Sequence, residues 1–318
     1  MKRLNCEITI DDNVINFVTE VEINSSWKEF TDKAFIKIPK RITKNGEPVF
    51  IGQNSLFKRG DKVTIKLGYF PNLETRFDGY IYNIHIDSPV VLECHDEFFK
   101  LKENTLTKSY AKVNLNTLLS DIAGEVEFTT NTATAELGQF RISNATPAQV
   151  IEELKKTYLL NAFIKGKKLQ VGKQYVDELS KEVAITKEVQ VINDDLTYQK
   201  EEDVKIRIKA VSMLPNNQKI EVEVGDVTGE VRTAFFYDLD QATLKETAER
   251  ELPLFKYTGF RGAFTTFGEP FIEHGDIIEY KSLKFPEYTG KYFADSVKTT
   301  FGQGGFRQIV ELGRKAEV

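Results

Sequence analysis

Hydrophobic and polar residues alternate along most of the first hundred positions, and this pattern predicts a series of short β-strands. Because successive side chains of a strand point to opposite faces, each strand would bury one side and expose the other. Turn-forming residues separate the runs, and the stretch 40–60 is predicted to be loop. The predicted strands are Glu7–Ile10, Ile15–Ile23, Ala34–Ile38, Val63–Leu67, Phe77–Ile86 and Val90–Cys94. Strands at this spacing predict a barrel or a sandwich.

A helical period replaces the alternation after residue 105. Asn114 can cap a helix that runs to Ile122, with apolar residues on one face. Thr146 and Gln149 form a capping box, and Pro147 stands at the first helical position, where its missing N–H costs nothing. Two short strands follow, at 161–164 and 168–171. Residues 106–178 therefore predict a small α/β module.

The strand pattern returns in residues 179–318 and is interrupted by one helix. Asp240 can cap this helix, which we expect to run from residue 241 to about 251 because Pro253 follows. The predicted strands are 189–192, 204–210, 219–224, 259–266, 277–280, 292–300 and 306–312. The fold class is therefore mainly β, with 1–105 as a first barrel and 179–318 as a second barrel with inserted strands.

The two strand-rich parts repeat an order of features, which indicates an internal duplication. Gly60-Asp61 precedes an alternating strand, and Gly79 lies at the start of the next long strand. Gly275-Asp276 and Gly290 have the same order in the second part, although 15 residues separate the glycines there instead of 19. Glycine before a strand allows a tight turn, and glycine at a barrel corner allows close backbone approach. We assign these glycines and aspartates as structural turns of the duplicated barrel.

Composition and charge narrow the class of protein. Two cysteines exclude a disulfide scaffold, and with three histidines they make a structural zinc site improbable. The 43 basic and 48 acidic residues leave a net charge of −5, which argues against a general nucleic-acid binder. No apolar run approaches the length needed to cross a bilayer, and no apolar export signal follows the first residues.

Three patterns suggest chemistry, and each has a simpler structural reading. Cys94-His95-Asp96 has the residue types of a nucleophilic triad, but neighbours along a strand alternate faces and do not converge. The three histidines lack metal-ligand spacing, and the glycines of 302–305 lack the lysine of a phosphate-binding loop and predict a hairpin turn. We therefore assign no catalytic, cofactor-binding or metal-binding residue, and we expect that the chain is not an enzyme and binds no cofactor.

The order of these motifs resembles the late control gene D proteins of phages, the central baseplate hub of contractile tails. The amino-terminal resemblance rests on Gly60-Asp61-x-Val63-x-Ile65, Phe77-x-Gly79-x-Ile81 and Leu92-Glu93-Cys94-x-Asp96. The carboxy-terminal resemblance rests on Gly259-Phe260, Thr265–Pro270, His274-Gly275-Asp276, Gly290-Lys291-Tyr292, Ser296-Val297 and Phe306-Arg307. The family is similar to the first part of the type VI secretion spike protein.

This resemblance implies two barrels like those of tail-tube proteins and a homotrimer, in which six barrels imitate a sixfold ring. Such a ring adapts the sixfold tail tube protein to a trimeric spike. We expect the spike to be a separate polypeptide, because the chain ends six residues after its last predicted strand. Baseplate wedge proteins are further partners to consider. The implied location is the virion tail baseplate, after synthesis in the bacterial host cytoplasm, with no nucleic-acid specificity and no membrane insertion.

Two questions stay open at this stage. A tail-associated cell-wall hydrolase is the alternative function, although the sequence shows no added domain with converging catalytic residues. The sequence also does not separate a phage tail from a phage-tail-like bacteriocin or a secretion system.

Overall fold

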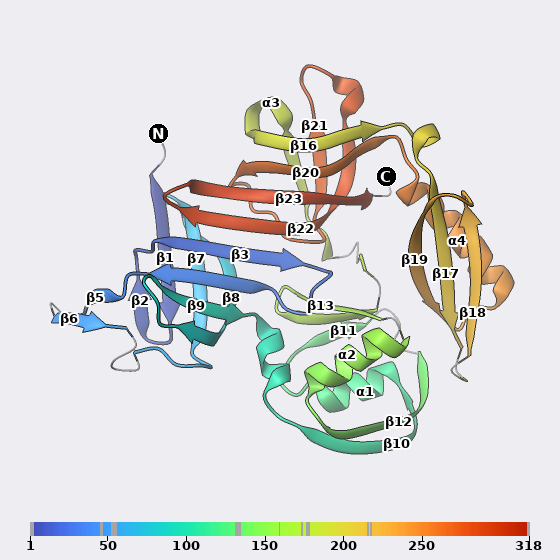
Figure 1. Cartoon of the computed structure of the whole chain (residues 1–318), viewed down its shortest axis with the longest axis horizontal. Helices are drawn as coiled ribbons and strands as arrows, with labels where there is room; N and C mark the ends of the chain where they lie inside the picture. Colours follow the sequence, from blue (N-terminus) through green and yellow to red (C-terminus); the bar gives the residue numbers. More distant parts are fainter. Residues whose placement is uncertain are drawn as a thin grey trace.

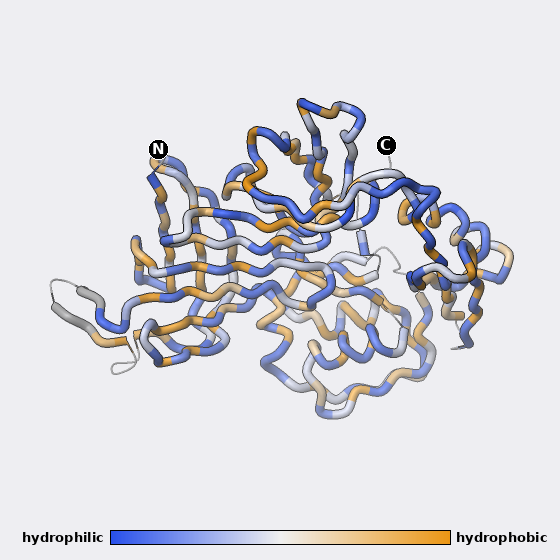
Figure 2. Tube along the Cα trace, turned by 45° about the horizontal axis from the view of Figure 1, so that its top comes forward, coloured by the Kyte–Doolittle hydropathy of each residue, from blue (hydrophilic) through white to orange (hydrophobic). Residues whose placement is uncertain are grey.

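The computed structural model describes residues 3–44, 47–51, 56–130, 135–158, 160–172, 174–175, 179–214, 216 and 218–316. The fold is mainly β, as predicted, and its largest sheet has 13 strands (Figure 1). Hydrophobic and hydrophilic positions alternate along the long strands (Figure 2), so each strand buries one row of side chains.

The first repeat, as we call the amino-terminal strand unit, forms around one hydrophobic cluster of isoleucine, valine and leucine side chains. Its strands are β1 (Leu4–Ile10), β2 (Asn13–Ile15), β3 (Glu20–Ser26), β4 (Lys33–Ile38), β7 (Lys62–Tyr69), β8 (Glu74–His85) and β9 (Val90–His95). The hairpin of β5 (Arg41–Lys44) and β6 (Glu47–Phe50) projects from it at one end of the molecule (Figure 1). A short 3₁₀ helix, η1 (Glu97–Lys102), follows β9.

The α/β module has its own core and lies below the large sheet in Figure 1. Its elements are β10 (Leu106–Asn114), α1 (Leu115–Ile122), β11 (Phe128–Thr130), β12 (Glu136–Ala145), α2 (Pro147–Tyr158), β13 (Asn161–Lys165) and β14 (Lys168–Gly172). Both predicted caps form. The Asn114 side chain accepts a hydrogen bond from the Thr117 amide at 2.8 Å, and Thr146 and Gln149 exchange the two bonds of a capping box.

The second repeat packs around a cluster rich in aromatic residues. Its strands are β15 (Glu182–Thr186), β16 (Val191–Gln199), β20 (Gly259–Phe267), β21 (Ile277–Lys281), β22 (Gly290–Gly302) and β23 (Gly305–Lys315). Between β16 and β20 the chain inserts a separate three-stranded sheet covered by one helix. This insertion consists of η3 (Glu201–Asp203), β17 (Ile206–Met213), β18 (Lys219–Gly225), β19 (Glu230–Tyr237) and α4 (Gln241–Phe255). Two short helices, α3 (Lys187–Gln190) and η4 (Pro286–Tyr288), complete the unit.

Several sequence-based elements need correction. The predicted strand Ile15–Ile23 is broken, because β2 ends at Ile15 and β3 begins at Glu20. The stretch 40–60 contains the β5–β6 hairpin, while Gly46 and Gly52 lie outside the described residues. The segment 189–192 spans the end of α3 and the start of β16, and α4 continues past Pro253. Strands β10, β12, β15 and β19 were not predicted, and the proposed boundary at residue 178 lies outside the described residues.

The two repeats have the same strand order in the large sheet. In the first repeat the neighbours run β1, β7, β8, β9, β4, β3, and in the second they run β15, β21, β22, β23, β20, β16. All these pairs are antiparallel except β15–β21, which is parallel. The order of six strands is therefore the same in both repeats, and the directions of five of them also agree, which indicates a structural duplication.

Candidate functional site

The two Gly-Asp turns have the same backbone geometry in both repeats. Gly60 has φ +90° and Gly275 has φ +78°, a left-handed region that favours glycine. The Gly60 amide donates to the carbonyl oxygen of Ile81 at 2.8 Å, and the Gly275 amide donates to that of Ala294 at 2.7 Å. Each turn therefore joins the start of one strand to the middle of the next.

Asp61 and Asp276 also make matching contacts. The Asp61 carboxylate accepts a hydrogen bond from the Lys58 amide at 2.9 Å, and the Asp276 carboxylate accepts one from the Glu273 amide at 2.9 Å. Both aspartates are buried. Burial raises the pKa of Asp61, and the bond from Lys58 opposes that rise. The two aspartates are buried acceptors that fix their turns.

Gly79 and Gly290 do not occupy equivalent positions. Gly79 lies inside β8, not in a turn, and pairs with Val63, whereas Gly290 begins β22 and pairs with Tyr280. Val63 and Ile278 each lie three residues after the glycine of their turn, and their cross-strand partners are Gly79 and Tyr292, so Gly79 corresponds to Tyr292, two residues after Gly290. The predicted equivalence of these glycines is therefore wrong by two positions, since the spacing of 19 against 15 residues concealed a difference in loop length.

The repeats join edge to edge through β3 and β22, which form an antiparallel pair in the middle of the large sheet (Figure 1). On the open face of this junction Lys298 Nζ lies 2.9 Å from Glu22 Oε2, and Lys37 Nζ lies 2.7 Å from Glu20 Oε2. On the core face the side chains are buried. The register pairs Ser296 with Ser26, Lys298 with Asn24, Thr299 with Ile23, Phe301 with Val21 and Gly302 with Glu20. This junction fixes how one repeat sits beside the other.

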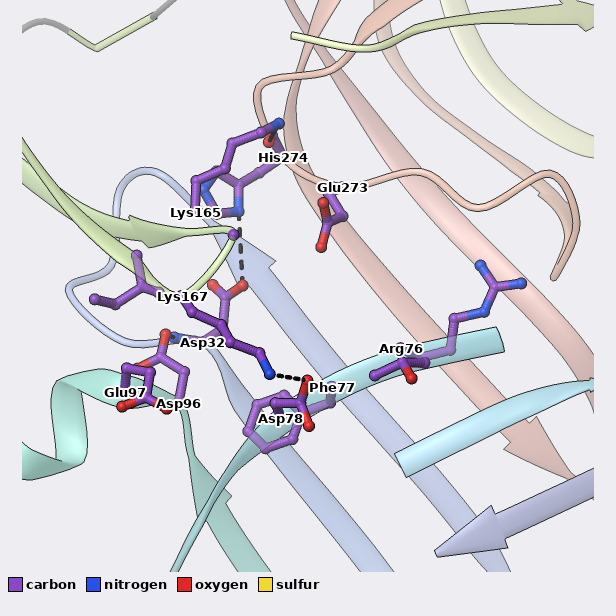
Figure 3. Close-up of a pocket in the computed structure, with 13 residues that line it drawn as sticks. Asp32, Arg76, Phe77, Asp78, Asp96, Glu97, Lys165, Lys167, Glu273 and His274 are labelled. Carbon is purple, nitrogen blue, oxygen red and sulfur yellow. Dashed lines mark hydrogen bonds and ion pairs between the residues drawn. The ribbon is translucent and has the colours of Figure 1, made fainter. Parts of the chain in front are cut away.

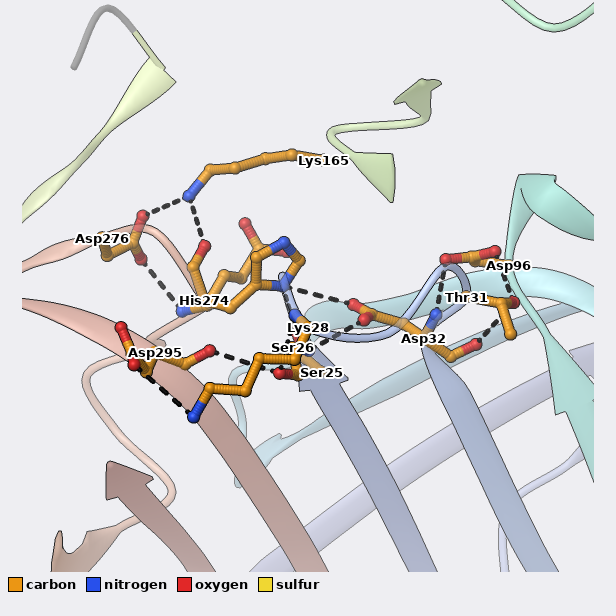
Figure 4. Close-up of polar contacts among 11 residues, drawn as sticks. Ser25, Ser26, Lys28, Thr31, Asp32, Asp96, Lys165, His274, Asp276 and Asp295 are labelled. Carbon is orange, nitrogen blue, oxygen red and sulfur yellow. Dashed lines mark hydrogen bonds and ion pairs between the residues drawn. The ribbon is translucent and has the colours of Figure 1, made fainter. Parts of the chain in front are cut away.

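A buried polar cluster lies at one end of the junction (Figure 4). His274 Nδ1 lies 2.6 Å from Ser25 Oγ and 3.7 Å from an oxygen of Asp32. The Asp32 amide and the Thr31 hydroxyl both donate to the Asp96 carboxylate, at 2.7 and 2.8 Å. Residues from β3, from the β3–β4 loop and from the second repeat therefore meet within one hydrogen-bonded network.

The α/β module contributes Lys165 to the same cluster. Its Nζ donates to the Asp276 carboxylate at 2.9 Å and to the His274 carbonyl oxygen at 2.8 Å. A pocket of about 210 Å³ opens beside it, lined by both repeats and the module (Figure 3). In this pocket Lys167 of the module pairs with Asp78 of the first repeat at 2.9 Å. The cluster thus ties three parts of the chain together.

Burial perturbs the acid–base groups of the cluster in opposite directions. Burial, together with the charge of Lys165, lowers the pKa of His274 to about 3. Burial raises the pKa of Asp32, and the neighbouring Asp96 charge adds to that rise. Burial raises the pKa of Asp96 to about 6, against the hydrogen bonds that it accepts. The folded junction therefore favours a neutral histidine together with protonated carboxyl groups.

The stability of the junction should depend on pH through these groups. The contribution of neutral His274 to the free energy of unfolding is complete above about pH 6.5 and is lost as the pH falls toward 3. The contribution of Asp96 has the opposite sign, since it is complete below 3.8 and is lost as the pH rises toward 6. We expect His274→Gln to lose less stability than the parent protein on acidification from pH 6.5 to 4. Denaturant unfolding at several pH values measures this.

Asp96→Asn should change the pH dependence of stability in the opposite direction, and the same unfolding measurement tests it. It should make the chain lose more stability on acidification than the parent, because it removes the group that favours low pH. Parallel pH profiles for the parent and both variants would contradict the assignment.

Two strand edges remain open at the ends of the double repeat. Within the described residues, β16 pairs only with β20, and the second half of β8 pairs only with β9. Exposed apolar side chains lie beside these edges. Ile86 follows β8 and is 52% exposed, and Ile192 at the start of β16 is 44% exposed. Unpaired edges with apolar residues are surfaces on which another strand can pair.

The triplet 94–96 does not converge into a catalytic site. Cys94 is buried in the core of the first repeat, and burial raises the pKa of its thiol. His95 stacks on Tyr82 and contacts Glu93 at 3.0 Å, and Asp96 caps η1 by accepting from an amide of that helix. Each residue has a separate structural role.

The described part of the chain contains neither a metal-binding cluster nor a membrane-spanning helix. Among those residues, no three histidine, cysteine, aspartate or glutamate side chains are arranged to hold a metal ion. No described helix combines the length and apolarity that crossing a bilayer requires. Gly302 and Gly305 pair across the predicted hairpin turn between β22 and β23.

Sequence patterns identified the Gly-Asp turns but missed the polar cluster and the open edges. Ser25 and Asp32 are seven residues apart, but Asp96, Lys165 and His274 are distant from them and from each other in sequence and show no common spacing. The pairing of β3 with β22 brings Ser25 close to His274, and the pairing of β4 with β9 brings Asp96 close to Asp32. Local patterns carry no signal for pairings of that range.

Comparisons with known proteins show that this chain is similar in fold to several solved structures. No family model matches the chain, and no curated protein matches its sequence. Among solved structures, a tail protein from Neisseria meningitidis MC58 covers 98% of this chain and 97% of its own length, with a TM-score of 0.62 at 10% identity. The 43 kDa tail protein of prophage MuSo2 from Shewanella oneidensis covers 98% of both chains, with a TM-score of 0.61 at 11% identity.

A third similar structure comes from a secretion system. The E. coli c3393 protein is described as a component of the type VI secretion system with structural similarity to the T4 bacteriophage tail proteins gp27 and gp5. It matches 98% of this chain and 77% of its own length, with a TM-score of 0.59 at 10% identity. At these identities the comparisons establish that the chain has the fold of tail proteins.

Proposed function

We propose that this chain is a structural baseplate hub of a contractile phage tail or a related injection machine. Three copies form a ring in which six similar repeats surround one axis. The chain acts by assembly and not by catalysis, and its place is the tail baseplate of the particle. The proposal includes the division into a first barrel (1–105), an α/β module (106–178) and a second barrel (179–318).

The duplicated strand order carries this proposal. Two repeats of one topology are joined side by side through β3 and β22, so one chain supplies two similar units of a ring. Within the chain, β3 pairs with one edge of β22. The corresponding edge of β8 is open, and β16, which corresponds to β3, has no partner on its outer side in the described chain. Repetition of one contact around an axis gives a closed ring.

A ring of this kind would serve as a symmetry adapter. Six similar repeats can meet a sixfold tail tube protein on one face, while three identical chains can hold a separate trimeric spike protein on the other. Tail proteins of two bacterial sources share the fold over 97% and 98% of their length, and the c3393 protein links the fold to a type VI secretion system. These likenesses support a structural role in such a machine.

The proposal is tested by measuring the mass of the purified chain by light scattering, alone and with its spike protein. We expect particles of three chains, with the spike protein bound as a further trimer. A monomer under both conditions, at every concentration at which the chain is soluble, would reject the hub.

A further inference from the structure

We infer that the ring closes when the open edge of β8 and the residues after it pair with β16 of a neighbouring copy, in the same register as β22 with β3. This inference rests on the proposed function and adds the contact that joins the chains. The partner of each open edge is a second copy of this chain, because the equivalent edge in the other repeat is already paired with a strand of the same chain.

The equivalence of the long strands follows from the Gly-Asp turns. Ile81 and Ala294 make the same backbone bonds to their turns, so β8 and β22 align at these residues. Both strands then have a bulge one residue later, between Ile81 and Asn83 in β8 and between Ala294 and Ser296 in β22. With the bulge in common, Ile86 corresponds to Thr299.

The equivalence of the edge strands follows from pairing across each sheet. In the first repeat a continuous row of partners runs from Ile81 through Cys94 and Ala34 to Ile23. In the second repeat the same row runs from Ala294 through Leu312 and Gly262 to Leu196. Leu196 therefore occupies in β16 the position that Ile23 occupies in β3.

The inferred junction pairs residues of compatible character. Inside the chain Thr299 pairs with Ile23, so Ile86 would pair with Leu196 of the neighbouring copy. The half-exposed Ile86 would then gain an apolar cover. On the open face, the internal ion pair of Lys298 and Glu22 corresponds to His85 and Asp195 of the neighbouring copy.

A loop at the rim supports the same contact. In the first repeat, the end of β7 contacts the second repeat, since the rings of Tyr69 and Phe306 lie 5.6 Å apart. The corresponding loop after β21 carries Leu283 and Phe285, which are 68% and 52% exposed. In the ring this loop would pack on the first repeat of the neighbouring copy, as Tyr69 at the end of β7 packs on the second repeat within the chain.

Disulfide trapping tests the register in the full chain. The substitutions His85→Cys and Thr197→Cys place two cysteines opposite each other across the contact between copies. These positions correspond to Lys298 and Asn24, which lie opposite each other within the chain. Opposed positions of an antiparallel pair lie within disulfide range. We expect oxidation to give covalent dimers and trimers on a denaturing gel, and reduction to remove them.

Two further variants complete the experiment. Lys298→Cys with Asn24→Cys should form a disulfide within one chain and shows that the chosen geometry can be oxidised. Ile84→Cys with Thr197→Cys is shifted by one residue, so its side chains point to opposite faces and should not crosslink. Light scattering records the oligomeric state of each. A trimer whose internal pair oxidises while the 85–197 pair stays reduced overturns this junction and leaves the hub intact, whereas a monomer rejects the hub itself.

Discussion

Ile86→Lys is expected to leave each chain folded and to weaken assembly of the ring strongly. Ile86 is half exposed in the single chain, so a lysine there can reach water without disturbing the core. In the ring the lysine would face Leu196 of the neighbouring copy, where an unpaired buried charge costs about 3 kcal/mol or more per contact. At 1.4 kcal/mol for each tenfold change, the concentration needed for assembly should rise at least about 100-fold.

Light scattering over a concentration series measures this effect, with circular dichroism to verify folding. Ile309→Lys is the matched control, because Ile309 is 40% exposed on β23 in the interior of the sheet and lies between Lys298 and Thr265, away from both open edges. The control should assemble like the parent chain. Unchanged assembly of Ile86→Lys would show that this edge of β8 stays open in the ring.

Gly79→Ala is expected to prevent stable folding of the first repeat. A methyl group on Gly79 would lie 2.2 Å from the carbonyl oxygen of His95 in the adjacent strand, and backbone cannot move aside as a side chain can. Separating β8 from β9 would open the core beneath them, so we expect a loss of more than about 3 kcal/mol. Thermal unfolding of the soluble fraction measures the loss, together with the yield of soluble protein.

Two other glycines calibrate this result. Gly304 lies in the β22–β23 turn with open space around it, so Gly304→Ala should unfold like the parent. At Gly290 the added methyl would meet the side chain of Tyr292, which is itself buried, so Gly290→Ala should have an intermediate effect. Equal stability of Gly79→Ala and Gly304→Ala would contradict the close approach of β8 and β9 at Gly79.

Local sequence patterns were sufficient to predict much of the fold. The caps at Asn114, Thr146 and Asp240 act within one helical turn, so their residue types alone predicted where the three helices begin. The Gly-Asp turns were found for the same reason, since a left-handed glycine and a capping carboxylate act over a few residues. The class of fold followed from the strand alternation.

Non-local pairing explains what the sequence could not predict. β19 pairs in parallel with β17, and β15 pairs in parallel with β21, so neither has a hairpin neighbour to mark it. The pairing of β3 with β22 joins residues 270 or more positions apart, and no turn residues mark it in the sequence. The polar cluster around His274 depends on that pairing and was missed with it.

Electron microscopy of the purified assembly, viewed along its axis, tests the central claim most directly. The account predicts a closed ring of three chains with six similar lobes, in which the contact between chains repeats the β3–β22 contact within a chain. A ring with another number of chains, or one in which the two repeats of each chain lie at different distances from the axis, would contradict it.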